Sequence, residues 1–188
     1  MKLAARSLHR RLAPWLLLPL AVAAITGLTY RVGRTWFGMS KETGHQVLDA
    51  HTGAWLGGAG EQIYVALTGL GLLALAVGGA FLLRTGRARG GARGGHRVAA
   101  WALLAPLFIT ATTGLGYYFG EAWLGLDHTS LKPLLSLHQG SWLGPTLRPF
   151  YVLLVGGGLL YLLGSGAAML RRRSRPAQVA DRPSDATA

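Results

Sequence analysis

Residues 150–170 read FYVLLVGGGLLYLLGSGAAML, a run of 21 residues without a charged side chain. A helix of about 20 apolar residues crosses the hydrocarbon core of a membrane, which is roughly 30 Å thick. Three further stretches of this kind lie near residues 12–32, 62–84 and 98–119. A lipid-exposed backbone must satisfy its own hydrogen bonds, and the alternation typical of a barrel is absent. We therefore expect an all-α membrane protein with four transmembrane helices.

The composition agrees with this class, because 51% of the 188 residues are hydrophobic and only 14% are charged. The first stretch continues past the usual length of a signal peptide, lacks a clear cleavage site and recurs later, so we predict a retained span. The chain has no cysteine, which excludes disulfides and thiolate metal ligands. We also find no nucleophile–base pair and no phosphate-binding loop, which argues against hydrolase and kinase chemistry.

The net positive charge lies on one side of the predicted spans. The segments before the first span, between the second and third, and after the fourth hold 14 of the 19 basic residues and two of the seven acidic ones, and thus carry the whole net charge of +12. The positive-inside rule then predicts that both termini are cytoplasmic, in a bacterial inner membrane or an internal membrane. Membrane topology explains this charge without a nucleic-acid partner, so we expect membrane lipids as partners and no nucleic acid.

The chain is an internal repeat, because a shift of 87 residues aligns its two halves without a gap. The matched pairs include His9/His96, Arg10/Arg97, Thr26-Gly27-Leu28/Thr113-Gly114-Leu115, Trp36/Trp123, His51/His138, Gly53/Gly140 and Trp55-Leu56-Gly57/Trp142-Leu143-Gly144. We predict a first helix–loop–helix repeat over 1–86, with spans near 12–32 and 62–84. The second repeat covers 87–175, with spans near 98–119 and 150–170, and a flexible tail follows at 176–188.

Each repeat crosses the membrane twice, so the two copies are expected to be parallel and related by a pseudo-two-fold axis along the membrane normal. Equivalent residues then lie at equal depth. His9 is expected to face His96 near the basic side, and His51 is expected to face His138 near the other side. The remaining histidines, His45 and His128, have no histidine at the matched position and are expected in solvated loops.

Paired histidines suit the axial positions of a haem iron, because the porphyrin fills the equatorial plane and a helical bundle supplies the slot. A zinc site would lack ligands, since no Cys, Asp or Glu recurs between the copies. We therefore predict that His9, His96, His51 and His138 are metal ligands. The alternative is that these residues only anchor helix ends and were inherited by duplication.

Several neighbouring residues could contact such a cofactor. Gly53 and Gly140 would let a flat macrocycle approach the backbone. Leu48, His51 and Trp55 recur at a spacing that predicts one face of a short interfacial helix. Gly27 and Gly114 are interpreted as sites of close helix packing.

Arginines could bind the carboxylates of the cofactor. Arg10 and Arg97 are the candidates on the basic side, and Arg31, Arg34 or Arg148 are the candidates on the other. Each of them could instead be a topology determinant that reaches the lipid headgroups.

These motifs resemble the PepSY-associated transmembrane proteins, which include bacterial inner-membrane reductases of iron–siderophore complexes. The resemblance rests on Leu8-His9, Thr26-Gly27 and His51-x-Gly53-x-x-x-Gly57, and on His96, Thr113-Gly114 and Leu137-His138-x-Gly140-x-x-x-Gly144. Gly95 precedes His96 where the family has leucine, and the loops are too short for the extracytoplasmic domains of larger members. The resemblance implies two bis-histidine b-type haems and electron transfer across the membrane.

The expected function is therefore electron transfer from a cytoplasmic donor, through two haem b groups, to an extracytoplasmic acceptor such as a ferric chelate. The direction is taken from the family, and the chain is a possible transmembrane oxidoreductase or an electron-transfer subunit. Two alternatives stay open at this point. One is a non-catalytic assembly or accessory subunit, and the other is a chlorophyll-binding membrane protein in which one histidine ligates each pigment.

Overall fold

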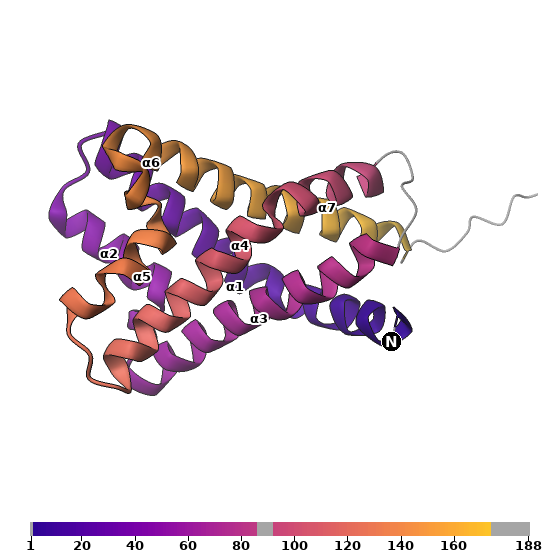
Figure 1. Ribbon diagram of the computed structural model, residues 1–188, viewed down its shortest axis with the longest axis horizontal. Helices are drawn as coiled ribbons and strands as arrows, with labels where there is room; N and C mark the ends of the chain where they lie inside the picture. The colour runs from indigo at the N-terminus through magenta and orange to yellow at the C-terminus, as the bar shows by residue number, and fades with distance from the viewer. Residues whose placement is uncertain (1, 86–91, 174–188) are drawn as a thin grey trace, which may run out of the picture.

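Four long helical segments form the body of the computed structural model, which describes residues 2–85 and 92–173 (Figure 1). They are α1 (Lys2–Trp36), α3 (Gly58–Thr85), α4 (Ala92–Ala122), and a fourth made of α6 (Gly144–Val152), the π-helical turn η3 (Leu153–Gly157) and α7 (Gly158–Arg173). All four are long and apolar enough to cross a membrane, and they contain the four predicted spans. The predicted all-α fold is confirmed, whereas the boundary at 86/87 and the tail at 176–188 lie outside the described residues.

The four segments form a bundle in which each packs against two others. α1 and α4 both pack closely against α3 and α7, whereas within the described residues the backbones of α1 and α4 do not approach each other as closely. α1 and α4 therefore lie diagonally opposite. Figure 1 shows the start of α1, the end of α3, the start of α4 and the end of α7 at one end of the bundle. Among the described residues, Arg6 and Arg10 of α1, Arg84 of α3, Arg93 of α4 and Arg171 of α7 lie in the parts of the helices that reach this end.

The other end carries two short helices, α2 (Lys41–Thr52) and α5 (His128–Gln139), which pack on α1 and α4 respectively (Figure 1). Ser40 caps the start of α2 by accepting from the Thr43 amide, and Asp127 caps α5 by accepting from the Thr129 and Ser130 amides. Ser40 and Asp127 occupy matched positions 87 residues apart. Both repeats therefore have a side-chain cap at the start of the short helix, although the capping residue differs.

Glycine ends both short helices. Gly53 (φ 77°) and Gly140 (φ 70°) adopt the left-handed conformation, which glycine reaches without steric cost. Short 3-10 turns follow at η1 (Ala54–Leu56) and η2 (Ser141–Leu143). The prediction that Trp55 shares a helix face with His51 is therefore wrong, because α2 ends before Trp55 and this side chain is 70% exposed. The expectation that His45 and His128 lie in loops is also wrong, because both are exposed residues of α2 and α5.

The core of the bundle is built from matched positions of the two repeats. It contains Leu16, Leu20, Ala24 and Leu72 from the first half, and Leu103, Leu107, Ala111 and Leu159 at positions 87 residues later, together with Val155. In α1 these residues follow one another every fourth position, which gives one apolar stripe along the helix. The repeat of the sequence is thus also a repeat of core positions, while the pseudo-two-fold axis itself stays a prediction.

Glycines bring the repeats into close contact at two equivalent places. A Cβ atom on Gly69 of α3 would lie 2.5 Å from Cγ of Leu115 on α4, and one on Gly156 of η3 would lie 2.8 Å from Cγ of Leu28 on α1. Both contacts join one repeat to the other. Close approach at small residues is the usual basis of helix association in lipid, where apolar burial contributes little.

Large apolar side chains cover the outside of the bundle. Leu18 is 71% exposed, Ile63 67% and Leu154 61%, although each lies inside a span. Such a surface is unsuited to water and suits contact with lipid acyl chains.

We expect Gly69→Ala to lower the free energy of unfolding by about 1–3 kcal/mol, because the added methyl group overlaps Leu115 and neither helix can move freely. Thermal unfolding in detergent measures the effect. Gly164→Ala is the matched control, since a Cβ atom there meets nothing and alanine favours the helix. Equal melting temperatures for the two variants would contradict the packing role of Gly69.

Candidate functional site

The imidazole of His51 is held against the middle of α1. Its Nδ1 atom lies 2.9 Å from the Ala23 carbonyl oxygen and 3.1 Å from the Thr26 hydroxyl oxygen. The Thr26 hydroxyl itself donates to the Val22 carbonyl at 2.7 Å, so both neighbours of Nδ1 act as acceptors. The neutral ring therefore carries its proton on Nδ1, which leaves a lone pair on Nε2.

His138 is held in the same way against α4. Its Nδ1 atom lies 2.8 Å from the Thr110 carbonyl oxygen, and Thr110 is the residue matched to Ala23 by the sequence repeat. A carbonyl can only accept, so this ring too has its proton on Nδ1 and its lone pair on Nε2. A hydrogen bond from the second ring nitrogen to a carbonyl is the usual way in which a protein orients a metal-binding histidine.

Two glycines of the long helices make room for these rings. A Cβ atom on Gly27 would lie 3.3 Å from Cε1 of His51, and one on Gly114 would lie 2.8 Å from Cε1 of His138. Gly27 and Gly114 therefore make room for the histidine rings. This differs from our interpretation of the sequence, in which they are sites of close packing between helices. The recurrence of Gly27 and Gly114 at the spacing of 87 was the signal that could have identified them.

The rings of His51 and His138 lie close together, with centroids 6.2 Å apart and planes inclined at 61°. A metal–imidazole bond of about 2.0–2.1 Å, added to the roughly 1.1 Å from a ring nitrogen to the ring centre, puts two trans ligands about 6.3 Å apart. The spacing also suits an edge-to-face contact between aromatic rings. The orientation of both Nδ1 atoms toward carbonyls is what favours metal ligation over a simple ring contact.

The surroundings of this pair keep both imidazoles neutral. Burial and the neighbouring His138 lower the pKa of His51 to about 4, and burial lowers the pKa of His138. Neutral imidazole is the form that binds metals. The described residues contain no group of three or more His, Asp or Glu side chains able to hold a metal ion.

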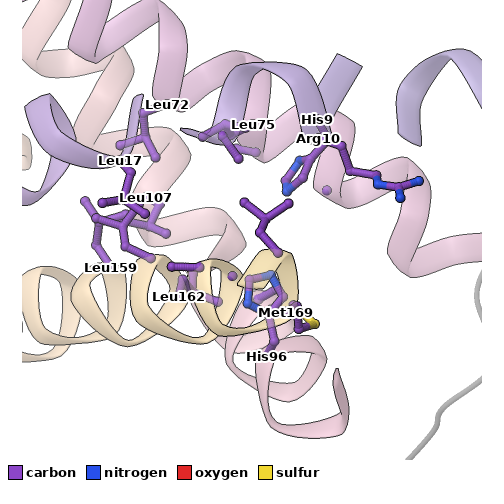
Figure 2. A pocket seen from close by; sticks show the side chains of 18 of the residues that line it. His9, Arg10, Leu17, Leu72, Leu75, His96, Leu107, Leu159, Leu162 and Met169 are labelled. Atoms are coloured by element: carbon purple, nitrogen blue, oxygen red, sulfur yellow. The ribbon is translucent and has the colours of Figure 1, made fainter. Parts of the chain in front are cut away.

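His9 and His96 line a second site at the opposite end of the bundle. They point from α1 and α4 into a cavity of about 250 Å³ whose other walls are mainly leucine, including Leu75, Leu107 and Leu162 (Figure 2). Small residues border the rings, since a Cβ atom on Gly79 would lie 3.9 Å from His9 and one on Gly166 would lie 3.8 Å from His96. The predicted pairing of His9 with His96 thus corresponds to one apolar cavity.

We call His9 and His96 the inner pair and His51 and His138 the outer pair. The inner pair differs from the outer pair in its hydrogen bonds. Nδ1 of His96 lies 2.8 Å from the Ser165 hydroxyl oxygen, and that hydroxyl donates to the Tyr161 carbonyl at 2.7 Å. Ser165 therefore accepts from His96. Gly78 stands at the matched position of the first repeat, so the buried Nδ1 of His9 has no hydroxyl beside it among the described residues. The backbone carbonyl that faces His9 is that of Leu75, which the repeat matches with Leu162 beside His96.

The other predicted contact residues lie as follows. Arg10 lines the cavity, and Figure 2 shows its guanidinium directed away from the two imidazoles. Arg97 instead donates to the Leu83 carbonyl at 2.6 Å, near the end of α3, while Arg93 lines the cavity. A Cβ atom on Gly53 would meet the ring of Tyr64, which together with the left-handed cap accounts for the glycine. The proposed cofactor contacts of Arg10, Arg97, Gly53 and Gly140 stay predictions.

No protein-family model matches the chain, and no curated protein or solved structure is significantly similar to it.

We expect acid to destabilise the metal-free protein between about pH 6.5 and pH 4. The unfolded chain protonates His51 near its ordinary pKa of about 6.5, whereas the folded site takes up that proton only at about pH 4. The free energy of unfolding therefore falls as the pH drops through this interval. Thermal unfolding in detergent measures it. His51→Gln should show a shallower dependence than the exposed control His45→Gln, and equal slopes would contradict the assignment.

Proposed function

We propose that the chain is a membrane-embedded b-type di-haem protein that transfers electrons across the membrane. The observation that carries the proposal is the outer histidine pair, where both Nδ1 atoms meet acceptors and the ring centroids lie 6.2 Å apart, a spacing at which both rings could bind one metal ion. The apolar cavity lined by His9 and His96 supplies a second position for the same kind of ligand.

The residues that would hold the two haems are His51 with His138, and His9 with His96. Haem, when bound, supplies a one-electron couple at its iron. The chain's own part is to orient the imidazoles through the Ala23, Thr110 and Ser165 oxygens, to keep the rings neutral, and to exclude water with leucine side chains. Hydrogen bonds of this kind also tune the basicity of the ligands.

The two sites lie at different levels of the bundle, as transfer across a membrane requires. The ring of His51 contacts α1 at Ala23, which is 14 residues beyond His9 on the same helix. At about 1.5 Å per residue this is about 21 Å along the helix axis. We propose a donor on the basic side and an acceptor such as a ferric chelate on the other.

The spacing of the outer pair argues against the chlorophyll alternative. Two pigments would need two metals with two stacked macrocycles between the imidazoles, and the stacking alone adds about 3.5 Å to the separation of the rings. The observed 6.2 Å accommodates one metal. An accessory subunit without a cofactor would leave the shared orientation of His51 and His138 toward backbone carbonyls without a use.

We expect the purified protein to show reduced b-type absorption bands with about two haems per chain. His138→Ala should lose one haem and keep the other, because the two sites share no ligand. His128→Ala, at an exposed histidine of the same helix, is the matched control and should keep both. A colourless preparation would overturn the proposal, and red chlorophyll absorption would favour the pigment alternative.

A further inference from the structure

Two arginines from different repeats meet at one glutamine. Nη2 of Arg31, on α1, lies 2.9 Å from Oε1 of Gln139, at the end of α5. Arg148, on α6, donates to the same oxygen. One neutral acceptor is thus shared by two guanidinium groups. Each guanidinium has five N–H donors, so most of the donors need other acceptors.

The two positive charges lack a negative partner in this part of the structure. The Nε atoms of Arg31 and Arg148 are buried without an acceptor, and neither arginine forms an ion pair with an Asp or Glu of the described residues. A third arginine, Arg34, adds further positive charge near Arg31. Paired, partly buried cations repel each other and lose hydration, so the arrangement is costly unless an anion binds between them.

The arginines lie beside the outer histidine pair. Gln139 directly follows His138 in α5, and Arg31 is four residues beyond Gly27, the residue that seats His51. Residues four apart share one face of a helix, so Arg31 lies one turn from the His51 ring along α1.

The equivalent place in the other half of the molecule has the opposite character. The repeat matches Arg31 with Tyr118 and Arg148 with Glu61. Tyr118 and Glu61 interact through a side-chain hydrogen bond. The α1–α6 interface therefore carries two positive charges where the α4–α3 interface carries one negative charge. A ligand between the two interfaces would meet an electrostatic asymmetry across the predicted axis.

We propose that Arg31 and Arg148 bind the two propionate carboxylates of the haem held by His51 and His138, so that this haem lies in one orientation with its propionate edge toward the α1–α6 interface. The inference rests on the proposed function. Two guanidinium groups match two carboxylates in charge, and planar guanidinium forms paired hydrogen bonds with a carboxylate. Gln139 holds the two side chains together at the edge of the site.

Titration of the metal-free protein with haem b and with haem b dimethyl ester tests this assignment, because the ester lacks both carboxylate charges. A His96→Ala background leaves the outer pair as the only pair of histidine ligands. We expect Arg148→Gln to weaken binding of haem b about tenfold to a hundredfold and to leave binding of the ester unchanged. Arg31→Gln should behave in the same way.

Two matched controls distinguish carboxylate binding by Arg31 and Arg148 from a nonspecific loss of structure. Arg34→Gln should change neither titration, because Arg34 is exposed and donates to the Met39 carbonyl. Glu61→Gln should not weaken haem b, because it removes a negative charge from the opposite interface.

The remaining outcomes each overturn the assignment. Equal weakening of haem b and its ester by Arg148→Gln would show a structural role. The arginine substitutions could also leave the binding of haem b unchanged. If inorganic phosphate then raises the melting temperature of the His96→Ala protein, the two arginines form a site for free or lipid phosphate instead. If the His96→Ala protein binds haem b and its ester and neither arginine substitution weakens either titration, the orientation proposal fails alone. If the His96→Ala protein binds neither haem b nor its ester, the proposed haem site at His51 and His138 fails as well.

Discussion

The hydrogen bonds from His51 Nδ1 to the Ala23 carbonyl and from His138 Nδ1 to the Thr110 carbonyl are the interactions on which the rest of the site depends. They tie each short helix to the long helix before it, and they decide which ring nitrogen keeps a lone pair. The glycines of the motif follow from this constraint. Gly27 and Gly114 leave space for the rings, and Gly53 and Gly140 turn the chain directly after them.

The two histidine pairs share a plan and differ in their hydrogen bonds. In the outer pair both rings donate to backbone carbonyls, whereas in the inner pair His96 donates to the Ser165 hydroxyl and His9 has Gly78 at the matched position. A hydrogen bond to the second nitrogen makes an imidazole a more basic ligand. Under the proposed function, this difference in hydrogen bonding would give two otherwise similar haem sites different potentials.

Much of the architecture could be predicted from the pattern of residues. Apolar runs predicted four spans, and the shift of 87 predicted that His51 faces His138, whose rings lie 6.2 Å apart. The role of Gly27 and the position of Trp55 could not be predicted in this way. Helical spacing does not show which neighbouring ring a glycine accommodates, and it does not show where a left-handed glycine ends a helix.

The sequence by itself determined the class of protein, the side of the spans that carries the net positive charge, and the positions that the duplication kept. These features follow from the length of apolar runs, the order of charged residues and the spacing of 87, all of which can be read along one chain. Only the tertiary structure decided which groups meet. Arg31 and Gln139 are 108 residues apart, and their contact depends on the packing of helices from different repeats. No periodicity links them, since the residues matched to Arg31 and Arg148 are Tyr118 and Glu61. The asymmetry of the outer site is therefore a property of the folded bundle.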